Sequence, residues 1–286
     1  MTSDGDNLWQ SRQRAHGVTP GGASTVTIEF RLFGQSLRLS TTASDQPMRL
    51  AEIVPLAWTV CDHIVHRTVQ FTQARGRMPS CHRGCDACCR YAVPLSVPEA
   101  MRLGQDVAAL PAGQRARTEK LFHQAVARIV QAGPPAIPAG PADACGPGRA
   151  DNAKALHAMA QWYSSLDMPC PLLVQRCCDF YSCRPTACRE HLAASQSALC
   201  AGNNPATGEL VPMPVSVTHA LSLLAAEMEG PPVEAILMPA ALAWCRDNAA
   251  RTNAAWPSRV LLERFAAILQ HLAGQAEQKR RDAAAA

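Results

Sequence analysis

The chain has 286 residues, of which 48% are hydrophobic and 17% are charged, and its formal net charge is +4. This composition suits a compact globular protein and argues against disorder of the whole chain. Because the net charge is small and no stretch interleaves Lys and Arg with aromatic residues, we expect no nucleic-acid partner.

The patterning also argues against a membrane or secreted protein. No window approaches the run of about eighteen apolar residues that a membrane span needs, and the N-terminus lacks an apolar stretch of secretory length. We therefore expect a cytoplasmic protein with no membrane partner. In a reducing cytosol, thirteen cysteines, an odd number at short spacings, are expected to bind metal and not to form a disulfide framework.

The elements in the first quarter of the chain change from strand to helix. Residues 24–42 alternate apolar and polar side chains, which predicts a β-hairpin whose buried face carries Val26, Ile28, Phe30 and Leu32. From Pro47 the pattern takes the period of a helix, which we expect Pro55 to kink and which should end near Gly76. Alanine-rich tracts and few β-branched runs elsewhere predict a mainly α fold.

Two cysteine-rich stretches, Cys81–Cys89 and Cys170–Cys200, interrupt the predicted helices. The first lies in a loop bounded by prolines, and the second is punctuated by prolines as well. The predicted helices outside these stretches begin at Ser96 or Val97 and otherwise run from about 113 to 131, from 151 to about 166, and near 216–229, 233–250 and 257–280.

This pattern divides the chain into four parts with irregular metal-binding loops between helices. They are a flexible N-terminus (1–23), a β-hairpin with a long helix (24–77), a cysteine-cluster metal-binding domain (78–201), and C-terminal helices packed on it (202–286). The third part includes a linker rich in Pro and Gly at 133–149, which contains Cys145.

Ten of the thirteen cysteines fall in the two stretches, at intervals that suit a soft metal ion. In the first stretch, Cys81, Cys85 and Cys88 have a spacing that lets neighbouring thiolates converge, and Gly84 permits a tight turn. Cys89 directly follows Cys88, and adjacent side chains converge poorly on one tetrahedral ion. Cys89 is therefore left with a second metal, another iron of a cluster, or no metal.

The second stretch offers four well separated candidates and two extra thiols. The candidates are Cys170, Cys178, Cys188 and Cys200, and the extras are Cys177 and Cys183. Bringing the two stretches together closes a loop of roughly 80 residues, at a cost of about 4 kcal/mol. Metal binding at a thiolate site contributes on the order of 10 kcal/mol, so a metal can hold the two halves together.

These residues resemble a known family. The chain reads C-x3-C-x2-C-C and then V-P-x-S-x-x-E-A, with Ser96 and Glu99 in the second motif. Later it reads C-P-x-L and C-x-x-Y-x-x-R-P-x-x-C-R-E, followed by a final cysteine. The pattern, over residues 78–201, is similar to the YkgJ-type cysteine-cluster proteins, described as a zinc- or iron-chelating domain, and a similar cluster occurs in flagellin lysine N-methylases.

The resemblance implies eight metal ligands: Cys81, Cys85, Cys88, Cys89, Cys170, Cys178, Cys188 and Cys200. Eight thiols could serve two four-coordinate centres, or one cluster with spare ligands. Zinc favours a closed set of four ligands, whereas adjacent cysteines and a surplus of thiols favour an iron–sulfur centre such as a 4Fe–4S cluster. The metal, its nuclearity and the roles of Cys89, Cys177 and Cys183 stay open.

Several other residues have both a functional and a structural interpretation. Arg184-Pro185 and Arg189-Glu190 flank Cys188 and could tune its thiol, or they could only cap a helix from Thr186 and pair with surface carboxylates. His82 and His191 could each replace a cysteine ligand, whereas His63, His66, Cys61 and Cys245 fit helix packing better. Asp179 and Tyr181 have no spacing that singles them out as an acid and a base.

Three functions compete. The first is a metal-binding protein whose centre is structural, handles metal or senses redox state, and it predicts a closed site without an adjoining pocket. The second is a metal-cluster-dependent protein-modifying enzyme such as a lysine N-methylase, which needs a cleft beside the centre for S-adenosylmethionine or a peptide. The third is a zinc-stabilised interaction module for a protein partner, which predicts an exposed apolar patch on the C-terminal helices.

Overall fold

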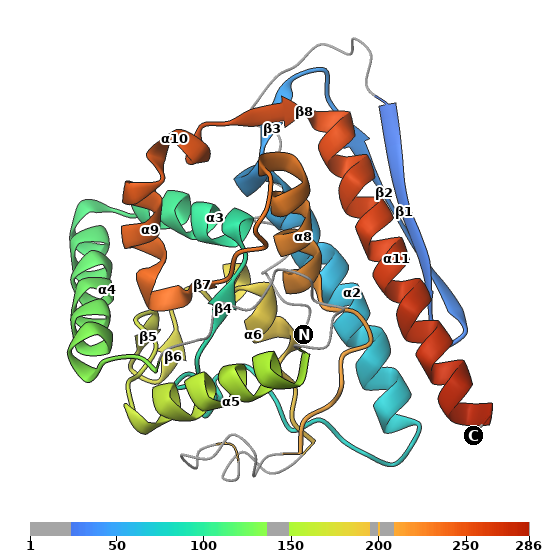
Figure 1. Cartoon of the computed structure of the whole chain (residues 1–286), viewed down its shortest axis with the longest axis horizontal. Helices are drawn as coiled ribbons and strands as arrows, with labels where there is room; N and C mark the ends of the chain where they lie inside the picture. The colour runs from blue at the N-terminus through green and yellow to red at the C-terminus, as the bar shows by residue number, and fades with distance from the viewer. Residues whose placement is uncertain (1–23, 136–148, 195–199, 201–208, 286) are drawn as a thin grey trace, which may run out of the picture.

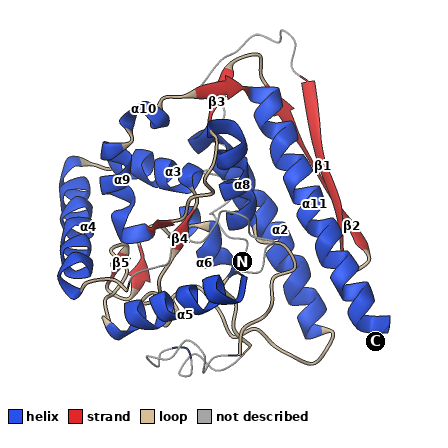
Figure 2. Ribbon diagram, in the orientation of Figure 1, coloured by secondary structure: helices blue, strands red, loops and turns tan. Residues whose placement is uncertain are grey.

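A computed structural model describes residues 24–135, 149–194, 200 and 209–285, with the backbone alone for 149–156. The fold is mainly α with a small N-terminal antiparallel hairpin, as the sequence predicts (Figures 1 and 2). The predicted flexible segment 1–23, Cys145 and residues 201–208 lie outside the described residues. None of the described helices is both long and apolar enough to cross a bilayer.

Most of the predicted helices form close to their expected bounds. In chain order the described helices are η1 (Leu50–Ile53), α2 (Val54–Gln73), α3 (Val97–Ala108), α4 (Ala112–Ala132), α5 (Arg149–Ser165), η2 (Tyr181–Cys183), α6 (Thr186–Glu190), α8 (Val217–Glu229), η3 (Met238–Ala240), α9 (Ala241–Asp247), α10 (Ala249–Thr252) and α11 (Ser258–Ala285).

The described strands form four separate two-stranded antiparallel pairs. They are β1 (Ser24–Leu32) with β2 (Gln35–Ala43), β3 (Pro47–Arg49) with β8 (Ala255–Pro257), β4 (Pro94–Leu95) with β7 (Ile236–Leu237), and β5 (Leu173–Val174) with β6 (Cys177–Cys178).

Three details of the predicted helices are wrong, and each has a local reason. The helical pattern does not begin at Pro47, because Pro47–Arg49 pairs with Ala255–Pro257 as β3 with β8. Pro55 does not kink a helix, because it lies at the start of α2, where its missing N–H has no intrahelical partner to lose. The helical pattern at 233–250 is broken into β7, η3, α9 and α10. The break follows from strand pairing at Ile236–Leu237 and from Pro239, which starts a new helical turn.

The predicted hairpin face is buried against the last helix. Val26, Ile28, Phe30 and Leu32 are all buried, and α11 runs alongside the hairpin (Figure 1). The turn at Phe33-Gly34 has positive φ at both residues, which is the geometry that matches the twist of a two-residue hairpin. The hairpin therefore covers one side of α11.

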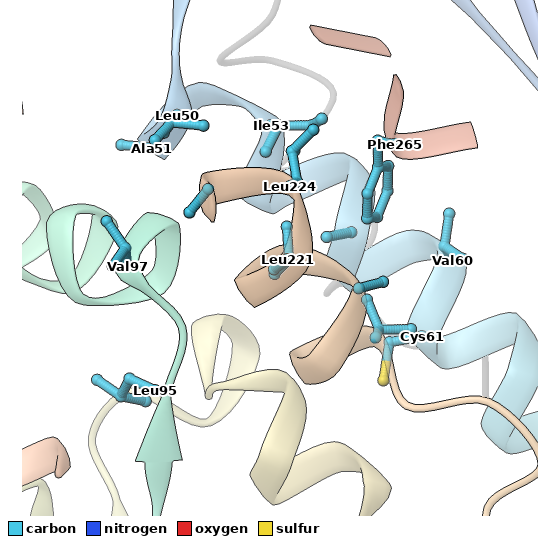
Figure 3. Packing of buried hydrophobic residues seen from close by; sticks show 14 of the residues in the cluster. Leu50, Ala51, Ile53, Val60, Cys61, Leu95, Val97, Leu221, Leu224 and Phe265 are labelled. Carbon is cyan, nitrogen blue, oxygen red and sulfur yellow. The ribbon is translucent and has the colours of Figure 1, made fainter. Parts of the chain in front are cut away.

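The core lies where α2, α3, α8 and α11 meet. Figure 3 shows Val60 and Cys61 of α2, Leu221 and Leu224 of α8, and Phe265 of α11 packed around a common centre. This cluster includes buried residues from all three predicted parts whose side chains the structure describes. Among them are Leu172 and Phe180 of the second cysteine stretch. The cysteine-rich loops are thus anchored on a rigid helical base.

We expect the replacement of Phe265 by Ala to destabilise the protein by about 3–5 kcal/mol, because its ring is fully buried and a cavity would remain. Val260, on the same helix, is 41% exposed and provides the matched control. Val260→Ala should change stability by less than about 0.5 kcal/mol. Denaturant unfolding of both variants measures the difference, and equal effects would contradict this packing.

Candidate metal centre

Helix α6, which carries Cys188, is held at its N-terminus by a buried carboxylate from α3. Glu99 is 3% exposed, and its Oε1 accepts hydrogen bonds from the backbone N and the Oγ1 of Thr186, both at 2.7 Å. Its Oε2 accepts from the backbone N and the Oγ of Ser96, at 3.2 and 2.8 Å. Ser96 and Glu99 thus form a capping box for α3, and the same carboxylate positions α6.

The other end of α6 is fastened by Glu190. Its carboxylate accepts hydrogen bonds from the Ser216 hydroxyl and from the backbone N of Val217 and of Thr218 at the start of α8. Burial raises the pKa of Glu190 to about 7, and these hydrogen bonds oppose the increase. The charge of Glu190 therefore caps α8 and fixes α6 against it.

Arg189 holds the loop that precedes α6. Its guanidinium donates to both carboxylate oxygens of Asp62 on α2, at 2.8 and 2.7 Å, and to the carbonyl oxygens of Arg184 and Ser182. This agrees with the structural interpretation of Arg189. Arg184 itself stacks on the Tyr181 ring at 4.1 Å and donates to the Tyr181 carbonyl at 3.1 Å.

Strands β5 and β6 present one of two adjacent cysteines to the interior. Gln175 and Arg176 have positive φ and form a two-residue turn, which pairs Leu173 with Cys178 and Val174 with Cys177. Because successive side chains of a strand point to opposite faces, Cys178 packs against the core and Cys177 is exposed. The structure therefore shows that Cys178 faces inward and Cys177 does not, which the sequence alone could not decide.

The two cysteine stretches lie against each other through main-chain hydrogen bonds. The backbone N of Cys170 donates to the carbonyl of Cys89 at 2.7 Å, and the backbone N of Ser80 donates to the carbonyl of Ala193 at 2.8 Å. The sulfur of Cys81 accepts a hydrogen bond from the backbone N of Ala193 at 3.2 Å. An ion pair between Arg176 and Asp86 at 3.0 Å adds a further link.

All eight predicted ligand cysteines lie in this region of the fold. Burial raises the pKa of the Cys188 thiol, and the neighbouring Cys170, Cys88 and Cys178 add to the increase. Burial likewise raises the pKa of Cys170 to about 12 and is the main cause of the raised pKa of Cys81 and Cys178. These thiols are close enough to influence one another electrostatically, although they come from segments about 80 residues apart in the chain.

Cys88 and Cys89 form a hydrogen-bonded pair of thiols. This bond lowers the pKa of Cys88 to about 7 and raises that of Cys89. The positive charge of Arg184 is a further cause that lowers the pKa of Cys88. Arg184 therefore lies near the Cys88 thiol, and its role in tuning that thiol stays a prediction.

The described thiols do not converge on a common point. Among the described residues, no group of three or more His, Cys, Asp or Glu side chains surrounds a single point at ligand distance. No disulfide joins any of the twelve described cysteines. The donor set nevertheless suits zinc or an iron–sulfur centre, because sulfur ligands are numerous and side-chain rotation alone changes where each points.

Some of the remaining candidate residues lie near the cysteines, and the others lie on a helix away from them. Cys183 packs against the core, and its pKa is raised by burial and by the nearby charge of Asp106 on α3. The His82 ring contacts the Ser80 carbonyl at 3.0 Å, and His191 Nε2 is buried with no hydrogen-bond partner among the described residues. His63 and His66 are exposed on α2.

The two cysteines assigned to packing lie where the sequence placed them. Cys61 is fully buried on α2, and its thiol lies 4.0 Å from the Thr186 carbonyl oxygen. Cys245 on α9 donates to the Ala100 carbonyl at 3.2 Å, and its sulfur fills the space above Gly104. Both belong to helix packing and not to the cluster of thiols.

A cavity of about 650 Å³ adjoins the cysteines. It is lined by Cys88, Tyr91, Cys188 and His191, and by residues of β4, α6, α8 and neighbouring loops: Ala92, Val93, Pro94, Ala187, Glu190, Ser216, Thr218, His219, Ser222, Val233, Glu234 and Ala235. Its volume falls within the range of pockets that hold small organic molecules. The expectation of a site without an adjoining pocket is therefore wrong.

Sequence reasoning missed three residues that shape the site. Tyr91 lines the cavity, and its hydroxyl donates to the backbone carbonyl of Cys200. Thr186 and Thr218, whose Oγ1 atoms are 2.8 Å apart, complete the polar contacts around α6. The only signal for Tyr91 is its position two residues after Cys89, and nothing in the pattern linked Glu99 to a threonine 87 residues later.

The predicted apolar patch on the C-terminal helices is not found in the described part of the chain. The exposed large apolar side chains there are Met78, Val130, Leu210, Val233 and Val260. Only Val260 lies on one of the helices α8 to α11. The geometry thus gives no support to an interaction module that uses this surface.

Comparison of the chain with protein-family models, with curated proteins and with solved structures finds no match.

We expect Glu99→Ala to destabilise the protein by about 3 kcal/mol, because buried donors of Ser96 and Thr186 lose their acceptor. The effect should extend to the site as a lower metal content after purification, since α6 carries Cys188. Glu119, exposed on α4, provides the control, and Glu119→Ala should stay within about 0.5 kcal/mol. A Glu99→Ala protein as stable and as metal-rich as the parent would contradict this role.

Proposed function

We propose that this protein is a cytoplasmic metal-binding protein whose cysteines hold an iron–sulfur centre or zinc. The observation that carries the proposal is that hydrogen bonds from Cys170 to Cys89, from Ser80 to Ala193 and from Ala193 to the Cys81 sulfur join the two distant segments that contain the eight cysteines. Thiols confined to packing would be scattered, as Cys61 and Cys245 are. A reducing compartment would keep these thiols available to a metal.

The chemistry of the donor set favours iron–sulfur slightly over zinc. Two cysteines are adjacent, and more than four thiols share the region, which suits a polynuclear centre. The resemblance of the cysteine motifs to YkgJ-type proteins supports the same proposal. A centre at this position would serve a structural, metal-handling or redox-sensing role by joining the two loops, at a free-energy gain larger than the cost of closing them.

Metal analysis of protein purified without oxygen tests this proposal. We expect iron with acid-labile sulfide, or stoichiometric zinc, and we expect Cys88→Ser/Cys89→Ser to lose metal because it removes the two central thiols. Cys245→Ser is the matched control, since a hydroxyl can keep the contact with Ala100. A parent protein that contains neither metal and takes up neither would rule the proposal out.

The cavity favours a second candidate function, a metal-dependent enzyme. A centre that only stabilised the fold would need no cavity of about 650 Å³ lined by Cys88 and Cys188. The cysteine cluster is similar to that of flagellin lysine N-methylases, so the specific activity that we propose for such an enzyme is protein methylation. In such an enzyme the cavity would hold S-adenosylmethionine or the substrate side chain beside the metal centre.

Calorimetric titration with S-adenosylmethionine tests this second candidate. We expect the metal-loaded protein to bind it and Ala235→Trp to abolish binding, because an exposed alanine of the cavity wall would become a bulky ring. Ala116→Trp places the same ring on an exposed position of α4, outside the cavity, and should bind normally. Absence of binding to the metal-loaded parent would contradict the methylase version.

A further inference from the structure

A second cavity, of about 290 Å³, lies between the start of α4 and the β5–β6 hairpin. It shares no lining residue with the cavity beside Cys88 and Cys188, and no described cysteine lines it. Its volume is just below the range of about 300–1,000 Å³ that drug-sized ligands occupy. The cavity therefore suits a molecule no larger than an amino acid.

One wall of this cavity is a single face of α4. Gln114, Arg117 and Thr118 line the cavity, and Leu121 lines it one turn further along. Their spacing of i, i+3, i+4 and i+7 places the four side chains on the same side of the helix. The helix is fixed in place because Phe122, on another face, is buried in the core. This face thus presents a cation, an amide and a hydroxyl to the cavity.

The other wall belongs to the second cysteine stretch. Asp179, directly after β6, lines the cavity, and its backbone N donates to the Leu172 carbonyl at 3.0 Å. The rest of this wall is apolar and consists of Pro171, Leu172, Val174 and Phe180. Because Leu172 and Phe180 are buried in the core, this wall is anchored as firmly as the helix.

The two walls carry opposite charges that do not pair with each other. In the part of the chain that the structure describes, neither the Arg117 guanidinium nor the Asp179 carboxylate forms an ion pair or a side-chain hydrogen bond. A guanidinium binds a carboxylate through paired hydrogen bonds, and a carboxylate accepts hydrogen bonds from an ammonium group. A ligand that carries both groups would satisfy both residues at once.

We propose that this cavity binds a small zwitterion with an apolar side chain, of the class of free apolar α-amino acids such as L-leucine. Arg117 binds its carboxylate, Asp179 binds its ammonium group, and the apolar wall takes its side chain. The proposal goes beyond the metal centre, because the ligand contacts no proposed metal ligand. The ligand would instead join α4 to the hairpin that carries Cys178.

Calorimetric titration of the full chain, as purified, with millimolar L-leucine tests the proposal. We expect leucine to bind. Isocaproate has the same carbon skeleton without the ammonium group, and isoamylamine has the leucine side chain and amine without the carboxylate. Each should bind at least about tenfold more weakly, because each loses one charge-assisted contact.

Two variants remove the charges of the cavity one at a time. Arg117→Gln and Asp179→Asn should each weaken leucine binding by at least about tenfold. Lys120→Gln and Glu119→Gln change exposed charges on α4 outside the cavity and should bind leucine as the parent does. All four side chains are exposed, so circular dichroism should show unchanged helices in every variant. Asp179→Asn should also leave isocaproate binding unchanged, since isocaproate has no ammonium group to lose.

A parent that binds no leucine, or binds isocaproate or isoamylamine as tightly as leucine, would overturn the proposal. Leucine binding that neither charge-removing variant weakens would overturn it as well. Ala235→Trp, which fills the cavity beside the cysteines, should leave leucine binding unchanged, and a loss there would mean that leucine occupies the wrong cavity. None of these results changes the metal content, so the proposed metal-binding function stands or falls separately.

Discussion

The site depends most directly on one buried carboxylate. Glu99 accepts four hydrogen bonds and joins the start of α3 to the start of α6, so it sets where Cys188 lies relative to the loop before α3. A buried charge is tolerated only when donors surround it, and here main-chain and hydroxyl donors do so. This requirement links the S-x-x-E motif at Ser96–Glu99, in the first half of the chain, to Thr186, which lies just before the C-R-E motif in the second half.

The helical core and the cysteine loops are stabilised in different ways. The core formed by α2, α3, α8 and α11 buries large side chains such as Leu221, Leu224 and Phe265, and it gives the loops a fixed base (Figure 3). In their described parts the loops contain only two-residue strands and short helices, and the second loop is anchored by the buried side chains of Leu172 and Phe180.

The cavity beside the cysteines gives a small molecule access to the proposed metal centre. Its wall includes Cys88 of the first cysteine stretch and Cys188 of the second, so a molecule bound there would lie beside both. Glu190 lies on the same wall, but its carboxylate is occupied by the start of α8. Ser216 and Thr218 hydrogen-bond to that carboxylate, and Glu234 pairs with Arg251. The polar groups of the wall that remain for a ligand are therefore those of Cys88, Cys188, Tyr91, His191, His219 and Ser222.

The sequence by itself determined the hairpin and most of the helices, through the alternation of Val26 to Leu32 and the 3.6-residue period of apolar side chains. Both patterns are local properties of the chain. The sulfur ligands that the cysteine spacing indicates stay a prediction. Only the tertiary structure decided which of Cys177 and Cys178 faces inward, that Glu99 holds α6, and that a cavity adjoins Cys88. These facts depend on turn geometry and on contacts between residues far apart in the chain, which no local pattern encodes.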